Sequence, residues 1–218
     1  MKSKISKSVA IIVAHPDDET LWAGGTILNH PSWNCFIVCL CRKNDKERSI
    51  KFYKALKALN AQGIMGDIDD GAEQIPLDEN ELKQTILKLL PTSNFDIVIT
   101  HNPTGEYTRH LRHEEVSKAV IELWFENKIS TKKLKLFAYD DGGKKYYPKA
   151  TENASDCQKL SENIWLRKYN IIADIYGFSI GSFEEATTPH TEAFWDFTDS
   201  ALAKKWLTNG GVLHKLIN

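Results

Sequence analysis

The sequence lacks the features of several large protein classes. It has no basic run longer than a pair, and its 28 Lys and Arg residues balance 29 Asp and Glu residues to a net charge of -1. This balance argues against a nucleic-acid-binding surface. No apolar run approaches the roughly 20 residues that a transmembrane helix needs. No internal repeat, low-complexity segment or Pro/Gly/Ser-rich linker divides the 218 residues, so we expect a single domain over 1–218.

Cysteine is also scarce. Three of the four cysteines, Cys35, Cys39 and Cys41, share one apolar stretch, and Cys157 stands alone. We interpret them as buried thiols of a protein in a reducing compartment. The alternative, a metal site on the CxxxCxC spacing, is disfavoured because alternating side chains of a buried strand rarely converge on one ion. The lysines before the first apolar run faintly resemble a signal peptide, but that run is short and ends in charges. We therefore expect a cytoplasmic protein.

The order of the predicted elements indicates the fold. Short apolar, β-branched runs alternate with amphipathic segments, which predicts a Rossmann-like α/β fold whose mostly parallel sheet has helices on both faces. The predicted strands are Lys7–Ala14, Asn34–Arg42, Gln62–Met65, Asn94–Thr100 and Leu134–Tyr139. The predicted helices are Thr20–Asn29, Asp45–Leu59, Asp78–Leu90, His113–Asn127 and Ser155–Tyr169. The segment beyond Ile171 has no clear pattern.

Chemically distinctive residues follow two of these strands. The stretch "VAHPDDE" places His15, Asp17 and Asp18 after the first strand, and His101 follows the fourth. In parallel sheets ligands bind beyond the carboxyl ends of the strands, so both segments reach the same edge. A histidine and an aspartate three residues apart form half of a zinc site, because zinc accepts nitrogen and oxygen ligands.

The missing ligand is expected in "HNPTGEYTRHLRHEEV". His110 and His113 lie three residues apart at a predicted helix start, so they can share one face. Each segment alone has an ordinary interpretation. Proline followed by acids is typical of the first turn of a helix, and isolated histidines are usually solvated. The convergence of both segments at one edge favours a metal site.

These motifs resemble those of the N-acetylglucosaminyl deacetylases, the PIG-L or LmbE-like family. The resemblance rests on "AHPDDE" and on "GEYTRHLRH", and it covers the element order of residues 8–140. It implies a zinc-dependent enzyme that removes acetyl groups from N-acetylated sugars, with one Zn2+ per chain. By the resemblance, His15, Asp18 and His113 bind zinc. Asp17 is the general base on the attacking water, and His110 is the general acid that also stabilises the oxyanion.

The resemblance also implies substrate contacts, each of which has an ordinary alternative. Arg48 is a candidate substrate contact or a solvated helix charge, and Asp70 is a candidate sugar ligand or part of an acidic turn. Tyr107, on the loop before His110, could cover the site or bind the oxyanion. His101 could orient a ligand or be structural. Glu19 is expected to be an outer-sphere or helix-capping residue.

One departure from the family pattern concerns the second histidine pair. The family often has His-Pro-Asp-His there, and the aspartate usually orients the acid histidine. This sequence has Arg112 at that place, and arginine cannot accept a proton from imidazole. Glu106, Glu114 and Glu115 are candidate substitutes. A positive charge near His110 would also shift its working range to lower pH.

Two other functions remain open at this stage. A metallophosphoesterase would usually need more carboxylate and histidine ligands than this edge supplies. A sugar-binding family member with impaired catalysis is compatible with Arg112, although Asp17 and His110 are both present.

Overall fold

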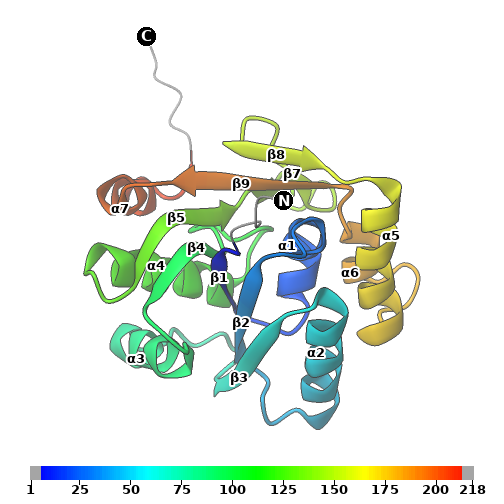
Figure 1. Cartoon of the computed structure of the whole chain (residues 1–218), viewed down its shortest axis with the longest axis horizontal. Helices are drawn as coiled ribbons and strands as arrows, with labels where there is room; N and C mark the ends of the chain where they lie inside the picture. Colours follow the sequence, from blue (N-terminus) through cyan, green and yellow to red (C-terminus); the bar gives the residue numbers. More distant parts are fainter. Residues whose placement is uncertain (1–5, 213–218) are drawn as a thin grey trace.

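A seven-stranded sheet organises the computed structural model, which describes residues 6–212 (Figure 1). Its strand order is β3-β2-β1-β4-β5-β9-β8, and the first five strands are parallel. The strands are β1 (Ser8–Val13), β2 (Asn34–Cys41), β3 (Gln62–Ile68), β4 (Asn94–Thr100), β5 (Ser130–Phe137), β8 (Asp156–Lys159) and β9 (Thr191–Phe197). The last two run antiparallel to their neighbours. The predicted mostly parallel α/β sheet is therefore confirmed.

Helices cover both faces of this sheet, as predicted. Side chains alternate along β1, so Ile11 belongs to the buried cluster that includes the helices after β1 and β2, whereas Ile12 belongs to the cluster that includes the helices after β3 and β4. α5 lies on the first side beside α1, and α7 lies on the second beside α4 (Figure 1). The helices are α1 (Asp18–Asn29), α2 (Lys46–Leu59), α3 (Glu79–Leu89), α4 (Leu111–Phe125), α5 (Glu162–Asn170), η1 (Ile171–Ile175), α6 (Phe183–Thr187) and α7 (Ser200–Thr208). Within 6–212, no helix is both long and apolar enough to span a bilayer.

Capping residues set several helix starts that the sequence had predicted. Asp45 accepts a hydrogen bond from the Arg48 amide and starts α2, and Asp78 accepts one from the Glu81 amide and starts α3. Each carboxylate satisfies an amide that the first helical turn leaves without a partner. The start of α2 matters for the site because it fixes where Arg48 leaves the helix.

The predicted helix Ser155–Tyr169 is partly wrong. Residues 156–159 form the strand β8, which pairs antiparallel with β9, and α5 begins only after the cap Ser161. The pairing partner lies more than thirty residues later, so a local pattern could not reveal it. Smaller differences occur at β3, which extends to Ile68, and beyond β5, where the short strand β6 (Tyr139–Asp140) pairs with β7 (Lys149–Ala150).

Candidate metal centre

The turn after β1 presents its polar residues to the carboxyl edge of the sheet. Asp17 caps α1 with a φ of 121°, and Asp18 is the first helical residue. The Asp18 carboxylate accepts hydrogen bonds from the His15 amide at 2.8 Å and, through its other oxygen, from the Trp22 indole at 3.1 Å. These contacts fix the Asp18 side chain, while Asp17 has a backbone conformation that residues other than glycine rarely adopt.

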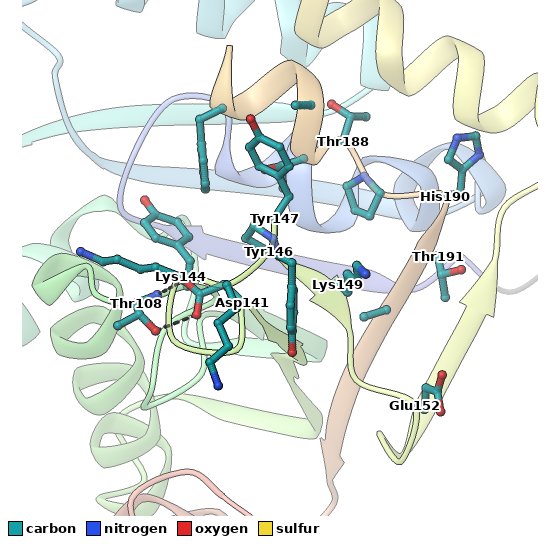
Figure 2. Close-up of a pocket in the computed structure, with 18 of the residues that line it drawn as sticks. Thr108, Asp141, Lys144, Tyr146, Tyr147, Lys149, Glu152, Thr188, His190 and Thr191 are labelled. Carbon is teal, nitrogen blue, oxygen red and sulfur yellow. Dashed lines mark hydrogen bonds between the residues drawn. The ribbon is translucent and has the colours of Figure 1, made fainter. Parts of the chain in front are cut away.

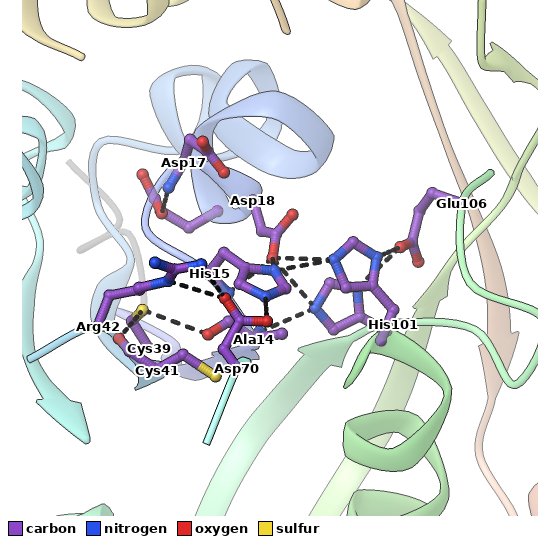
Figure 3. Close-up of polar contacts among 12 residues, drawn as sticks. Ala14, His15, Asp17, Asp18, Cys39, Cys41, Arg42, Asp70, His101 and Glu106 are labelled. Atoms are coloured by element: carbon purple, nitrogen blue, oxygen red, sulfur yellow. Dashed lines mark hydrogen bonds and ion pairs between the residues drawn. The ribbon is translucent and has the colours of Figure 1, made fainter. Parts of the chain in front are cut away.

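Three of the predicted ligand atoms lie close together. His15 Nδ1 is 3.1 Å from His113 Nε2 and 3.3 Å from Asp18 Oδ2, and His113 Nε2 is 3.4 Å from the same oxygen. Ligands at zinc bond lengths of about 2.0–2.1 Å in a tetrahedral arrangement are separated by roughly 3.3 Å. The observed spacing therefore suits a single tetrahedral ion. Figure 3 shows His15 and Asp18 side by side in this cluster.

The ring nitrogens of His15 and His113 that face away from the triangle have carboxylate partners, which agrees with metal binding by the other nitrogens. His113 Nδ1 contacts Glu106 Oε2 at 2.6 Å, and His15 Nε2 contacts Asp70 Oδ1 at 3.1 Å (Figure 3). If each of these nitrogens carries the proton, the nitrogen that faces the triangle has a free lone pair. Metal-binding histidines are usually oriented by such carboxylates.

His101 lies beside the same centre but is engaged differently. Its Nε2 accepts a hydrogen bond from the Ala14 amide at 3.0 Å, so its Nδ1 donates to Glu106 at 2.9 Å. Its ring stacks on His113 with a centroid distance of 4.0 Å. His101, Asp18 and His113 are close enough to hold an ion, as are His15, His110 and His113. The lone pair of His101 Nε2 already accepts the Ala14 amide proton, whereas His15 Nδ1 faces only the other candidate ligands, so His15 is the better ligand.

Glu106 is the residue whose role the sequence left most open. It was a candidate partner of His110, but its carboxylate contacts His101 and His113 instead. Complete burial would raise its pKa, yet the two histidines outweigh burial and hold that pKa at about 2. Glu106 is therefore an ionised carboxylate behind the metal ligands.

The electrostatics of the centre favour a cation. Burial would raise the pKa of Asp18, but His113 and His101 lower it well below its usual range. The pKa of His113 is raised to about 10, because Asp18 and Glu106 more than offset the effect of burial. A positive charge between these two carboxylates is thus strongly stabilised.

Asp17 lies beside this centre and has an elevated pKa. Burial is the largest cause, followed by repulsion from Asp18, and together they outweigh the attraction of Arg48. Arg48 Nη2 contacts Asp17 Oδ2 at 3.0 Å. A carboxylate whose pKa is raised by burial and a neighbouring acid is a suitable proton acceptor.

Glu19 completes the acidic triplet. Its Oε2 accepts a hydrogen bond from the Asp17 amide at 3.1 Å, and its Oε1 accepts one from the Tyr176 hydroxyl at 2.7 Å. Glu19 is fully buried. Glu19 contacts the backbone of Asp17, and an outer-sphere role stays a prediction. Its partner Tyr176 lies in the segment that had no clear pattern.

His110 is held far less firmly than His113. It caps α4 without a side-chain capping bond, and its buried Nδ1 has no hydrogen-bond partner in the described chain. Its ring stacks on His113 with a centroid distance of 4.6 Å and lies 4.5 Å from that of His15. Burial and repulsion from His113 and His15 lower its pKa to about 3. Arg112 is not the cause, so the reason expected from the sequence is wrong.

Arg112 instead faces the loop between β3 and α3. Its guanidinium donates to the carbonyls of Asp69 at 2.6 Å and Ile75 at 2.8 Å, and to Glu115 Oε2 at 2.6 Å. The other glutamate candidate, Glu114, pairs with Arg109. None of the three candidate glutamates therefore replaces the family aspartate beside His110.

The loop that Arg112 anchors carries Asp70. Besides its contact with His15, the Asp70 carboxylate accepts a hydrogen bond from Arg42 Nε at 2.8 Å. Nothing in the sequence had singled out Arg42, which directly follows β2 and has a φ of 68°. A substrate contact through Asp70 stays a prediction.

A pocket of about 180 Å³ unites the predicted residues. Asp17, Asp18 and His15 form one side, and His113 lies buried behind it. Five lining residues were not predicted: Leu21, Trp22 and Arg42, and also Phe183 and Glu184, which lie in α6, far along the sequence. The full lining is His15, Asp17, Asp18, Leu21, Trp22, Arg42, Arg48, Asp70, Tyr107, His110, Phe183 and Glu184.

Known proteins share this fold. The structure of N,N′-diacetylchitobiose deacetylase from Pyrococcus horikoshii superposes with a TM-score of 0.65 at 17% identity, covering 89% of this chain and 85% of that chain. GalB, the 4-carboxy-2-hydroxymuconate hydratase of Pseudomonas putida, gives a TM-score of 0.61 at 15% identity over 88% and 97% of the two chains. The fold thus occurs in a hydratase as well as in a deacetylase.

Sequence comparison is more specific than the fold. An uncharacterized protein of Acanthamoeba polyphaga mimivirus is 24% identical over 178 residues, which is 74% of this chain and 75% of that protein. Residues 10–124 match the PIG-L family, described as GlcNAc-PI de-N-acetylase. This match spans more than half of the chain and includes all the candidate metal ligands. The chain belongs to the PIG-L family.

Proposed function

We propose that this protein is a zinc-dependent N-deacetylase that hydrolyses the acetamido group of an N-acetylglucosamine-type sugar or sugar conjugate. The observation that carries the proposal is the triangle of His15 Nδ1, Asp18 Oδ2 and His113 Nε2, with sides of 3.1–3.4 Å, beside the buried base candidate Asp17. A zinc ion held there would polarise the amide carbonyl and lower the pKa of a bound water to roughly 7.

Asp17 takes the proton of the attacking water in this proposal. One of its oxygens is held by Arg48, which limits the directions that the other can take. The adjacent Glu19 holds the Asp17 backbone amide, so the position of the base does not depend on the side chain alone. The raised pKa of Asp17 makes proton transfer from an acidified water more favourable than it would be to an ordinary aspartate.

His110 protonates the leaving amine. With a pKa of about 3, its imidazole is neutral near pH 7 before the substrate reacts. Negative charge that develops on the oxygen of the tetrahedral carbon raises the imidazole's proton affinity, because an opposite charge nearby favours the protonated form. His110 then takes up a proton from solvent and gives it to the amine as the C–N bond breaks, while Asp17 returns the proton of the attacking water to solvent. The missing partner at Nδ1 leaves His110 able to adjust to the substrate.

The alternative of two-metal phosphoester hydrolysis receives less support. Within residues 6–212 the candidate ligand sets all include His113, so they describe one ion position rather than two. Two-metal phosphoryl chemistry requires ions about 3.5–4 Å apart, each with its own ligands.

Acetate release is the direct test. We expect the purified protein to release acetate from N-acetylglucosamine or its conjugates, to lose this activity with a chelator and to regain it with added Zn2+. The Asp17→Asn variant, matched in size, controls for a contaminating deacetylase. Zinc-loaded protein that releases no acetate from any member of a broad panel would contradict the proposal and leave a binding function.

A further inference from the structure

A second, larger cavity opens beside the metal pocket. It has a volume of about 1190 Å³, and Figure 2 shows part of its lining. Tyr107 and Phe183 line both this cavity and the pocket of about 180 Å³. One wall is the loop from Asp141 to Lys149, and the other is the segment from Phe183 to Thr191. Sites that enclose a small ligand typically have 300–1,000 Å³, so the metal pocket alone holds only the reacting end of a substrate.

Aromatic side chains connect the two cavities in a row. The Tyr107 ring contacts that of Phe183 with a centroid distance of 5.0 Å, and the Phe183 ring lies 6.1 Å from that of Tyr147. Phe183 and Tyr147 are 37% and 50% exposed. Aromatic rings that remain accessible along a cavity are typical of ligand surfaces, because their negative faces attract polarised C–H groups such as those of a sugar ring.

The loop wall is held in place by internal hydrogen bonds. The Asp141 carboxylate accepts hydrogen bonds from the Thr108 amide and hydroxyl, both at 2.7 Å (Figure 2). The Tyr146 hydroxyl donates to Asp140 at 2.6 Å, and Lys149 Nζ lies 4.9 Å from the centre of the Tyr146 ring. The loop is thereby tied to the segment that carries Tyr107 and His110, and its tyrosines have defined positions.

We propose that this cavity binds a further sugar ring of the substrate, so that the enzyme acts on an oligosaccharide rather than on a single N-acetylated sugar. The inference rests on the proposed deacetylase function. Tyr107 and Phe183 line both cavities, and Tyr147 lines the larger one next to Phe183. A sugar ring that continues the substrate beyond the metal pocket therefore meets accessible aromatic side chains. Apart from Tyr107 and Thr108, the residues of this cavity lie outside the matched range 10–124.

Acetate release from N-acetylglucosamine and from its β-linked disaccharide and trisaccharide tests the inference. We expect kcat/KM to rise by at least about tenfold from the single sugar to the disaccharide, mainly through KM. The Tyr147→Ala variant should remove most of this gain and leave activity on the single sugar nearly unchanged, because Tyr147 lines only the larger cavity. Equal kcat/KM for all three substrates would overturn the inference while leaving the deacetylase function intact. Failure on all substrates would instead contradict the function.

Two glycines of the loop offer a matched pair of variants. Gly142 and Gly143 have φ values of 62° and 70°, so alanine strains the backbone similarly at both. A Cβ at Gly142 would lie 2.5 Å from the Tyr146 ring, whereas one at Gly143 meets nothing within 4 Å. Gly142→Ala should therefore reduce the disaccharide gain, and Gly143→Ala should not. Equal losses would show that only loop strain matters and would contradict a role for Tyr146.

The lysines of the loop suggest a competing ligand class and a test for it. Lys144 and Lys145 also line the cavity, so an anionic acceptor is the competing ligand class. A substrate in which the second ring is replaced by a carboxylate or phosphate group tests it. If that compound is preferred over the disaccharide, and the preference disappears in a Lys144→Ala/Lys145→Ala variant, the oligosaccharide inference is wrong.

Discussion

His113 and His110 lie three residues apart and stack with ring centroids 4.6 Å apart, yet their surroundings differ. His113 is fully buried, and each of its nitrogens faces a carboxylate. His110 is half-buried, and its Nδ1 has no partner among residues 6–212. The two histidines belong to different regions of the pocket. The floor consists of His15, Asp18, His101, Glu106 and His113, and the mouth consists of Arg48, Tyr107, His110 and Asp70.

This difference in burial suits the two groups to different tasks: the floor residues to binding an ion, and the mouth residues to contacting a substrate. Floor residues have fixed directions because burial makes every unpaired polar group costly. Mouth residues retain exposure and, in the case of His110, an unused hydrogen-bonding group. A rigid floor suits metal ligands, whose positions must be held closely, and an adjustable mouth suits groups that contact changing charges.

The largest expected effect is the loss of the metal from the floor. His113→Ala removes one of three ligands, so we expect zinc content and acetate release to fall to background. Elemental analysis of protein purified without added metal measures the first effect. His30→Ala, on the far end of α1, is the matched control and should keep both. Full zinc occupancy in the His113→Ala protein would remove His113 from the ligand set.

The next effect separates Asp17 from its neighbour Asp18. Asp17→Asn should keep the zinc and reduce kcat by about 10²–10⁴, because the amide cannot accept the water's proton. Asp18→Asn should lose zinc along with activity. Metal analysis and kinetics on both variants check the pair, and zinc loss in the Asp17→Asn protein would show that the two roles are reversed.

A smaller effect is expected at His110 in the mouth. The general acid must be protonated and Asp17 ionised, so kcat/KM follows a bell against pH. The lowered pKa of His110 places the protonated form at low pH, and activity that depends on it falls as pH rises. His110→Ala should keep the metal, reduce kcat by about 10–10³, and flatten or shift the alkaline limb.

An activated amide sharpens this test. Its amine leaves with less protonation, so the loss in the His110→Ala variant should shrink on such a substrate. The wild-type profile alone cannot assign the limb, because coupled groups share macroscopic pKa values. Near-normal turnover with an unchanged profile in the variant would leave Asp17 as the proton donor to the amine.

The sequence predicted the floor better than the mouth, for a physical reason. His15, Asp18 and His113 follow or begin regular elements at the carboxyl edge of a parallel sheet, and that topology brings them together. Glu106 was visible in the same motif, but its direction was not, because a loop conformation decides whether it faces His110 or His113. Phe183, Glu184 and Tyr176 come from the C-terminal segment, whose position depends on the pairing of β8 and β9.

Arg112 shows that a family pattern at one position does not predict the direction of the side chain found there. The sequence placed its charge beside His110, whereas the guanidinium turns to the β3–α3 loop and leaves His110 to its other neighbours. A side chain with five donors reaches whichever carbonyls the fold supplies. Its direction is a property of that loop, whose course the local sequence does not determine.

The smallest expected effect tests whether the Arg112 anchor links the mouth to the floor. Arg112 holds the loop that carries Asp70, and Asp70 contacts the outer nitrogen of His15. Lysine keeps the charge but cannot contact two carbonyls and a carboxylate in a fixed fork. Arg112→Lys should therefore weaken zinc affinity by at most about tenfold, with kcat of the zinc-loaded enzyme nearly unchanged.

Arg109→Lys is the matched control, because its pairing with Glu114 is at the surface, where such pairs contribute little. Competition with a chelator of known affinity measures both variants. Equal zinc affinity in wild type and Arg112→Lys would show that His15 holds its position without the loop, and that the floor alone determines metal binding.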